Sequence, residues 1–571
     1  MMKDTDKIYC RILLDVFEAH GIQDVVASPG SRNAPILISI SYRENLRCHV
    51  ITDERNAAFT ALGIAMVSRN PVVLICTSGT ALYNYAPAIA EAYYQRIPLI
   101  VISADRPAQW IGQNDSQTLL QVNALQGIVK KEFDIPVENI DEEMNWYVNR
   151  IANEAVNVSG AGYPGPVHIN IQFGNPLSNT IDRKVFPTRV VSVMDSSPIL
   201  SFRMIQELKK RLEGKRILIV AGFMPPDNSL NKYLSLFASL PNVKLLCETI
   251  SNLHISGNPY AIDSVIAGLQ DSEKEKLRPD IVISIGGALI SGMLKDFIRK
   301  ASPEIWTLGD TSFEVDCFKN LTLNIRISPA IFFKTMYHPL KKCDTSTAPG
   351  YRVLWDEVCG KQIAIRKKFV EDINWSELKA FRFILDNLPI QYNLFLSNGT
   401  SIRYAQLFTN CIPHASYANR GVSGIEGTNA TAAGCALAYK GPTLLITGDM
   451  SFAYSPGIMG YALPPSFKII VINNKGGGIF RFISPTRYIE HRDRFFCADP
   501  ALPIEGLTQA YGWKYYSVDS EESMKRQFKD FLDYPSNTIM EIKIDEEYSA
   551  SILRKYMRLN GLAGNKTDSN I

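Results

Sequence analysis

The chain has 571 residues, of which 46% are hydrophobic and 20% are charged, a composition typical of a globular protein. Its 60 Lys and Arg residues nearly balance its 57 Asp and Glu residues, which leaves a net charge of +3. A charge this close to neutral gives no reason to expect a nucleic-acid partner. The length predicts roughly three or four domains.

The ten cysteines are dispersed singly and form neither a CxxC pair nor a Cys/His cluster with zinc spacing. This usage predicts a reducing compartment and no structural zinc. The opening MMKDTDKIYCRILLDVFEAHG places apolar residues at helical spacing among charges, unlike a signal peptide. No stretch reaches the roughly 20 apolar residues that span a bilayer. We therefore expect a cytoplasmic protein without membrane insertion.

Short β-branched runs alternate with helical segments in the first third of the chain. DVVASPGS, PVVLICTSGT and PLIVISADRP predict three buried parallel strands, each followed by a loop of small or polar residues. Helices are expected between them at residues 54–68 and 83–96. GPVHINIQFGNPL predicts a further strand, and the first domain is expected to cover residues 1–185.

The same alternation continues to the end of the chain. RILIVAGF, NVKLLCE, DIVISIGG and EIWTLGD predict the strands of a second domain, residues 186–345, which ends at the linker-like KKCDTSTAPG. YNLFLSNGTS, PTLLITGDMS and FKIIVINNKGGGIF predict strands of a third domain, residues 346–571. The expected fold class is α/β, with three doubly wound parallel sheets. Ligands of such sheets bind at the carboxyl ends of the strands.

One carboxylate, Asp449 in PTLLITGDMS, follows directly on a strand-like run. A Gly-Asp pair alone is most simply a helix cap. However, the next strand-like run ends 25 residues later at Asn474, and glycines follow from Gly476. Mg²⁺ prefers oxygen ligands, which Asp449, the Asn474 amide and the Gly476 carbonyl would supply. This spacing is the diphosphate–metal motif of thiamin diphosphate enzymes, with Met450 where many of them have glycine.

A thiamin enzyme must also deprotonate C2 of the thiazolium ring. A carboxyl group bonded to N1′ of the aminopyrimidine favours the imino tautomer, whose nitrogen can then take that proton. Glu54, in ITDERNAAFTALG, stands at the start of an Ala-rich helix after a strand-like run. An acidic residue in a first helical turn is also favourable by itself. Together with Asp449 and Asn474, we interpret Glu54 as catalytic.

The loop CTSGTALYN follows a predicted strand and is made of small residues. Ser78, Gly79 and Thr80 could approach a flat cofactor ring across a subunit interface. A simple strand-to-helix turn would use the same residues, so both interpretations stay open.

These motifs together resemble one family. SPGSRNAPI, DERNAAFTALG, TSGTALYNYAPAIAEA, ISADRP, NRGVSGIEGTNATAAG, ITGDMS and NNKGGGIF are similar, in order and spacing, to the 2-succinyl-5-enolpyruvyl-6-hydroxy-3-cyclohexene-1-carboxylate synthases of the menaquinone pathway. The resemblance covers the first and third predicted domains and is weak in the second. It implies the three-domain fold of thiamin diphosphate enzymes, with pyrimidine-binding, central and diphosphate-binding domains.

The resemblance also implies an activity and its cofactors. Such enzymes use thiamin diphosphate and Mg²⁺, which Mn²⁺ can replace, to decarboxylate 2-oxoglutarate. They then add the succinyl semialdehyde unit to isochorismate in a Stetter-like conjugate addition. Because they bind the cofactor between the first domain of one subunit and the third domain of another, a homodimer at least is implied, and a tetramer is plausible.

Four arginines suit two dicarboxylate substrates, because guanidinium binds carboxylate bidentately and stays charged. They are Arg32, Arg106, Arg403 and Arg420. Each lies near a predicted strand end, although a single arginine could equally form a surface ion pair.

The resemblance assigns these and further residues to places in the site. Around the acceptor or its reacting centre it places Ser31, Arg32, Arg106 and Gln117. Near the thiazolium it places Asn398, Arg403 and Arg420. Ile425 would prop the cofactor into its bent shape, and Phe480 would pack beside the substrate, although both could be ordinary core residues. In the diphosphate loop it places Gly448, Asp449, Met450, Ser451 and Asn474.

One position departs from the family pattern. These enzymes usually carry a lysine in a loop of the middle domain, directed towards a substrate carboxylate. In the corresponding IGGALISGMLKDF, Gly292 stands at that position and Lys295 follows three residues later. Either Lys295 takes over the contact or the cation is lost, which bears on acceptor affinity.

Three other functions compete with this interpretation. A thiamin-dependent carboligase or decarboxylase of the acetolactate synthase type would share Glu54, Asp449 and Asn474 but leave the arginines unexplained. A dinucleotide-binding protein would need a GxGxxG between a strand and a helix, and GGGIF lacks that spacing. A catalytically inactive homologue has only Gly292 in its favour.

Overall fold

In the computed structural model, the chain is described for residues 3–138, 141–183, 188–194, 196, 198–258, 260–309, 314–343, 350–408 and 413–559. It divides into two compact units, each continued by segments from elsewhere in the chain. Unit 1 consists of Met1–Asp195, Asn419–Thr443 and Tyr454–Phe467, and unit 2 of Ser196–Ala418, Leu444–Ala453 and Lys468–Ile571. In the described ranges, every helix is too short or too polar to cross a membrane.

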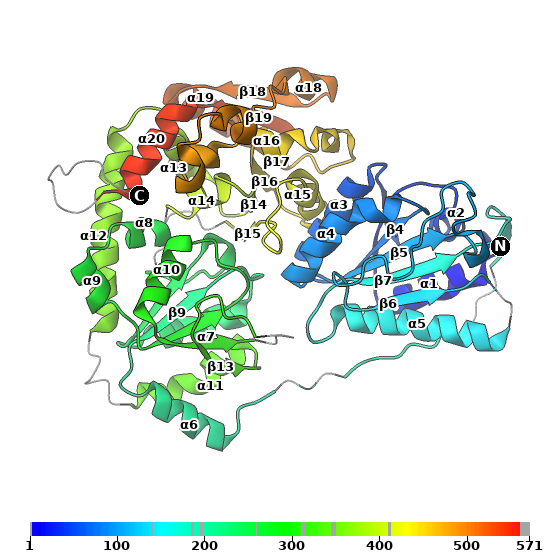
Figure 1. The fold of residues 1–571 in the computed structure, drawn as a ribbon, viewed down its shortest axis with the longest axis horizontal. Coiled ribbons are helices and arrows are strands. Elements are labelled where there is room, and N and C mark those ends of the chain that lie inside the picture. The colour runs from blue at the N-terminus through cyan, green and yellow to red at the C-terminus, as the bar shows by residue number, and fades with distance from the viewer. Residues whose placement is uncertain are drawn as a thin grey trace. The chain divides into compact units, whose positions relative to one another are not determined.

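Three main sheets carry the fold (Figure 1). The first has the strand order β3-β2-β4-β5-β7-β6, the second β10-β9-β11-β12-β13, and the third β15-β14-β16-β17-β19-β18. When the strands of each sheet are numbered along the chain, the first and third sheets have the same spatial order, 2-1-3-4-6-5. The predicted α/β class with three doubly wound parallel sheets is confirmed.

The repeated order has a consequence for function. In each sheet the chain starts in one strand, winds outward on one side and then crosses to the other, so neighbouring strands β2 and β4, or β14 and β16, send their connections in opposite directions. The crevice at this switch point, outside the carboxyl ends of the strands, is where ligands of such sheets bind.

Unit 1 contains the first sheet, with α1 and α5 beside each other against one face and α3 and α4 against the other (Figure 1). A small antiparallel pair, β1 and β8, lies next to it. The strands are β1 Lys3–Thr5, β2 Asp24–Ala27, β3 Arg47–Val50, β4 Val72–Cys76, β5 Leu99–Asp105, β6 Glu132–Ile135, β7 Val167–Gln172 and β8 Thr180–Asp182. The helices are α1 Ile8–Ala19, α2 Ala34–Ser41, α3 Glu54–Ser68, α4 Ala81–Gln95, α5 Glu142–Gly160 and α15 Thr428–Ala438.

Helix α15 packs along α3, although the two are far apart in the sequence. Glycines allow this close crossing. A Cβ on Gly63 would lie 2.0 Å from the carbonyl oxygen of Thr431, and a Cβ on Gly434 would lie 2.1 Å from that of Thr60. Any side chain at either glycine would separate the helices, so the crossing fixes the axis of the helix that begins at Glu54.

Unit 2 contains the second and third sheets. The strands of the second are β9 Ile217–Ala221, β10 Val243–Cys247, β11 Ile281–Ile285, β12 Glu304–Leu308 and β13 Leu321–Ile325. Those of the third are β14 Asn393–Leu396, β15 Ala415–Tyr417, β16 Thr443–Gly448, β17 Phe467–Asn473, β18 Lys514–Val518 and β19 Thr538–Lys543. Both sheets have valine- and isoleucine-rich strands that are buried on both faces, as helix-covered parallel sheets require.

The helices of unit 2 surround these sheets (Figure 1). Next to the second sheet they are α6 Phe202–Leu212, α7 Asn228–Ala238, α8 Ile262–Ala267, α9 Asp271–Lys276, α10 Gly292–Ala301 and α11 Pro329–Lys341. The long helix α12 Tyr351–Asp372 follows. The remainder are α13 Glu377–Asn387, α14 Ser401–Ala405, α16 Asp449–Ala453, α17 Ser484–Arg487, α18 Ile504–Ala510, α19 Glu521–Asp533 and α20 Glu546–Met557.

Each main sheet lies within one of the three predicted domains. The two predicted boundaries, at residues 185 and 345, fall outside the described residues. The domain limits 1–185, 186–345 and 346–571 therefore stay a prediction.

Candidate functional site

The predicted site residues fall into two sets, one in each unit. Glu54, Ser31, Arg32, Ser78, Gly79, Thr80, Arg106, Gln117, Arg420 and Ile425 belong to unit 1. Asn398, Arg403, Gly448, Asp449, Met450, Ser451, Asn474, Gly476 and Phe480 belong to unit 2. Most of them lie in loops or first helical turns that follow strands of the first and third sheets.

The carboxylate of Asp449 accepts hydrogen bonds from two backbone N–H groups, one of them in the first turn of α16. Asp449 is the first residue of α16, and its Oδ2 accepts a hydrogen bond of 2.8 Å from the N–H of Gly476, after β17. Its Oδ1 accepts from the N–H of Met450. The carboxylate thus joins the ends of two adjacent strands. Burial raises its pKa to about 6.

Gly476 can only be glycine here. Its φ of +102° favours glycine, and a Cβ would lie 2.0 Å from the carbonyl oxygen of Cys497. Its own carbonyl accepts from the N–H of Gly478 at 2.8 Å. A carbonyl oxygen has two lone pairs, so this bond leaves one for the predicted metal contact.

Asn474 lies beside Asp449 and Gly476, buried to 4% exposure. Its Nδ2 donates to the carboxylate of Glu377 at 3.0 Å. Its Oδ1 is buried and has no hydrogen-bond partner among the described residues. A buried polar atom without a partner is costly, and an oxygen in this state fits a cation contact. The donor set, carboxylate and amide oxygen, is the kind that Mg²⁺ takes.

The predicted acceptor residues of unit 1 meet at the ends of β2, β4 and β5. The N–H of Arg32 donates to Oγ1 of Thr77, and its guanidinium donates to the carbonyl of Phe173 at 2.9 Å. Burial lowers the pKa of Arg32, and the neighbouring Arg106 lowers it further. Arg106 pairs with Asp115 at 3.0 Å. Arg32 and Arg106 therefore lie near each other, with the carboxylates of Asp105 and Asp115 beside them.

Gln117 closes onto the loop after β4. Its Nε2 donates to the carbonyl of Ser78 at 3.1 Å, and its own carbonyl accepts from Oγ of Ser78 at 3.0 Å. Its φ is +57°, a sparsely populated backbone conformation for glutamine that the surrounding structure must hold. Gln121 supports the same loop by accepting from the N–H of Gly79 at 2.7 Å. Gln117 and the 78–80 loop are therefore one structural element.

Glu54 is the first residue of α3, as predicted, and is half-buried. The capping is done by its neighbour Asp53, whose side chain accepts from the N–H of Asn56 at 3.0 Å. The carboxylate of Glu54 is therefore not engaged as the cap of its helix. It lies close enough to Cys76, at the end of β4, to contribute to raising the pKa of that thiol, which burial raises most.

Gly292 is the first residue of α10, and a Cβ there would meet nothing within 4 Å. Nζ of Lys295 turns back towards the start of the helix and donates to the carbonyl of Leu289 at 3.3 Å. Asp263, a buried residue that the sequence did not bring to notice, lies near both Lys295 and Arg403. The structure therefore brings Lys295 to the same carboxylate as one of the predicted site arginines.

Glu91, on α4, is a second residue that sequence reasoning missed. It is 2% exposed, and its carboxylate accepts from three consecutive backbone N–H groups, those of Gly421, Val422 and Ser423, at 2.5, 2.7 and 3.2 Å. These residues lie between Arg420 and Ile425. The carboxylate thus holds the loop that presents both predicted site residues. A glutamate in the apolar AIAEAYY was the only signal for it.

Replacing Glu91 by alanine should loosen this loop, because three buried N–H groups lose their acceptor at about 1–3 kcal/mol each. We expect faster hydrogen exchange at residues 421–423, measured by mass spectrometry. Glu91→Gln, which keeps one acceptor oxygen, should show exchange rates at these residues between those of Glu91→Ala and the wild type. Strand β7 provides an internal control with unchanged exchange. Identical loop exchange in Glu91→Ala and wild type would contradict this role.

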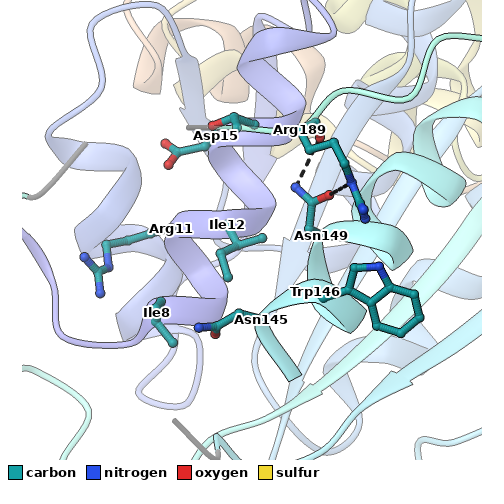
Figure 2. A pocket seen from close by; sticks show the side chains of 9 residues that line it. Ile8, Arg11, Ile12, Asp15, Asn145, Trp146, Asn149 and Arg189 are labelled. Atoms are coloured by element: carbon teal, nitrogen blue, oxygen red, sulfur yellow. Dashed lines mark hydrogen bonds between the residues drawn. The ribbon is translucent and has the colours of Figure 1, made fainter. Parts of the chain in front are cut away.

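One cavity in unit 1 lies away from these residues. It has a volume of about 290 Å³. Figure 2 shows it between α1 and α5, with Trp146 and Asn149 on its wall. Asn149 and Arg189 exchange hydrogen bonds of 3.2 Å there. None of the predicted site residues lines it. We assign it no function.

Two models of thiamine pyrophosphate enzyme domains match this chain. Residues 9–125 match the thiamine pyrophosphate enzyme N-terminal TPP binding domain, and residues 398–542 match the C-terminal TPP binding domain. Three relatives carry the name 2-succinyl-5-enolpyruvyl-6-hydroxy-3-cyclohexene-1-carboxylate synthase. That of Porphyromonas gingivalis is 38% identical over 97% of each chain. Those of Flavobacterium psychrophilum and Bacteroides thetaiotaomicron are each 33% identical, over 96% and 97% of this chain and 98% of theirs.

The alignments cover nearly the whole chain and so include the second sheet, for which the sequence motifs were weak. The relatives share one name. Glu54 lies within the match to the N-terminal TPP binding domain, and Asp449 lies within the match to the C-terminal one. This chain is a thiamin diphosphate-dependent transferase that belongs to the 2-succinyl-5-enolpyruvyl-6-hydroxy-3-cyclohexene-1-carboxylate synthase family.

Proposed function

We propose that the protein decarboxylates 2-oxoglutarate and adds the resulting succinyl semialdehyde unit to isochorismate, in menaquinone biosynthesis. The observation that carries this proposal is the pair of neighbouring guanidinium groups, Arg32 after β2 and Arg106 after β5. Isochorismate, the proposed acceptor, has two carboxylates that could pair with these two groups. Pyruvate, the substrate expected of the alternative carboligase, has a single carboxylate.

Thiamin diphosphate, when bound, supplies the carbon nucleophile of this reaction. Glu54 would hold a proton at N1′ of the aminopyrimidine, for which its carboxylate is not engaged as a helix cap. Asp449, Asn474 and the Gly476 carbonyl would hold Mg²⁺ or Mn²⁺, and that ion would hold the diphosphate. The buried Oδ1 of Asn474 supports this set. Gly448, Met450 and Ser451 would line the diphosphate beside Asp449.

The remaining residues would bind and orient the substrates. Ser31, Arg32, Arg106 and Gln117 would bind isochorismate, and Asn398, Arg403 and Arg420 would bind the carboxylate of the 2-oxoglutarate unit near the reacting carbon. Ile425 would support the bent cofactor, Phe480 would pack beside the substrate, and Ser78, Gly79 and Thr80 would face the pyrimidine. Lys295, near Arg403, would supply the cation that Gly292 lacks.

We also propose that the protein is at least a homodimer, acting in the cytoplasm. The family binds thiamin diphosphate between the first domain of one subunit and the third domain of the other. Glu54 and Asp449 lie in separate units, and the proposal requires them to serve one cofactor from different chains. A tetramer made of two such dimers is compatible with this arrangement.

The substrate distinguishes this function from its alternative, a carboligase of the acetolactate synthase type. With thiamin diphosphate and Mg²⁺, we expect CO₂ release from 2-oxoglutarate to exceed that from pyruvate by about 100-fold or more in kcat/KM, since a missing charged partner costs roughly 3–5 kcal/mol. Product analysis with isochorismate should show the conjugate adduct. A preference for pyruvate would favour the alternative.

A further inference from the structure

Glu377 is a buried carboxylate to which the proposed reaction gives no role. It is the first residue of α13 and is 2% exposed. The side chain of Ser376 caps this helix, and the backbone N–H of Glu377 donates to Oγ of Ser549 at 3.0 Å. The Glu377 side chain is therefore not needed to start the helix. It is directed instead towards the diphosphate loop, where Oε2 accepts from Nδ2 of Asn474 at 3.0 Å.

The other contacts of Asn474 leave its amide little freedom. A Cβ on Gly478 would lie 2.5 Å from Nδ2 of Asn474, so only glycine leaves space for the amide there. Nη1 of Arg481 donates to the backbone carbonyl of Asn474 at 3.0 Å. The backbone and the position of the side chain are thus held. The remaining freedom is rotation of the side-chain amide by half a turn, which decides whether Nδ2 or Oδ1 faces Glu377.

Glu377 fixes the orientation of the Asn474 amide. A carboxylate oxygen accepts and does not donate, so it draws Nδ2 and turns Oδ1 to the opposite side. Oδ1 is the buried oxygen that has no partner among the described residues. Without the carboxylate the amide could rotate by half a turn, and two N–H donors would then face the place where a cation is proposed.

Charge supports the same assignment. The Asp449 carboxylate is near enough to Glu377 to affect it electrostatically, and both are buried. Two buried carboxylates beside an oxygen without a partner are costly unless a positive charge lies among them. A divalent cation held by Asp449 and Asn474 would supply that charge.

We infer that Glu377 is a positioning residue, which orients the Asn474 amide so that Oδ1 faces the proposed metal site. This inference rests on the proposed function, because it requires that metal site. Residues that orient metal ligands typically change metal affinity by about 10–100-fold when they are replaced.

The test measures Mg²⁺ affinity by calorimetric titration in the presence of thiamin diphosphate, and Mn²⁺ binding by electron paramagnetic resonance without the cofactor. Glu377→Leu removes the acceptor, and Glu377→Asp keeps the charge but shortens the side chain by one methylene. Both should bind either ion about 10–100-fold more weakly. Glu377→Gln keeps an acceptor oxygen at the same reach and should remain within about threefold of the wild type, far less than that range.

Ser549→Ala is the matched control, because it removes the hydrogen bond to the Glu377 backbone and leaves the side chain intact. Its metal affinity should be unchanged. Wild-type affinity in Glu377→Leu and Glu377→Asp, or an equal loss in Glu377→Gln or Ser549→Ala, would overturn the inference. The Asp variant keeps the test decisive if the Leu variant does not fold. Wild-type protein that binds thiamin diphosphate equally well without a metal would instead refute the metal site of the proposed function.

Discussion

Glu54→Gln is expected to bind thiamin diphosphate as tightly as the wild type and to lose about 10²–10⁴-fold in turnover. The amide keeps the shape of the side chain at the start of α3 but cannot hold or release a proton at the cofactor. The helix itself should be unaffected, because Asp53 caps it. Calorimetry would measure cofactor affinity, and CO₂ release from 2-oxoglutarate would measure turnover.

Asp53→Asn is the control for this variant. It changes a charge at the adjacent residue while keeping a side chain that can accept from the N–H of Asn56. We expect turnover to stay within about fivefold of the wild type, the effect of roughly 1 kcal/mol from an exposed charge. Turnover in Glu54→Gln close to that of the wild type would end the assignment of Glu54 as the proton-holding group.

Asp449→Ala should abolish the Mg²⁺-dependent binding of thiamin diphosphate. The replacement removes a proposed metal ligand and also the acceptor for the N–H of Gly476, which joins the ends of β16 and β17. Since even residues behind the ligands change metal affinity by about 10–100-fold, we expect a loss of roughly 100-fold or more. Calorimetric titration of the cofactor at fixed Mg²⁺ would measure it.

Asp499→Asn provides the comparison for Asp449→Ala. Asp499 is an exposed carboxylate whose charge acts on Asp449, but it is not a proposed ligand. Its replacement should change cofactor affinity by no more than about fivefold. Unchanged affinity in Asp449→Ala, or equal effects of the two replacements, would refute the metal site.

Local patterns predicted the elements that carry the site. The helix expected at residues 54–68 has those limits, and that expected at 83–96 is α4, Ala81–Gln95. The strands before Asp449 and after it were expected because long buried runs of valine and isoleucine are typical of parallel sheets. The loops that end them follow from the same pattern.

Short or polar strands were not predicted. β3 and β18 have exposed or half-buried residues, and β15 has only three, so none shows a continuous apolar run. Strand order was beyond the sequence as well, because pairing joins segments whose patterns are alike. The shared order of the first and third sheets thus became visible only in the structure.

Supporting residues were missed for a different reason. The carboxylate of Glu91 bonds N–H groups about 330 residues further along the chain, and Glu377 contacts Asn474 across 97 residues. In sequence, Glu91 is one acid in a helix and Glu377 is an ordinary acid in a first helical turn. Their roles depend on which loop lies opposite, and no local spacing encodes that.

The crossing of α3 and α15 has a consequence for synthesis of the protein. Unit 1 takes its last segments from residues 419–443 and 454–467, so the ribosome must first translate the whole stretch from 196 to 418. At about 5–20 residues per second this takes roughly 10–45 s. Throughout that interval the face of α3 around Gly63 lacks its cover, because α15 has not yet been translated. We expect nascent chains of this length to be the species that chaperones bind.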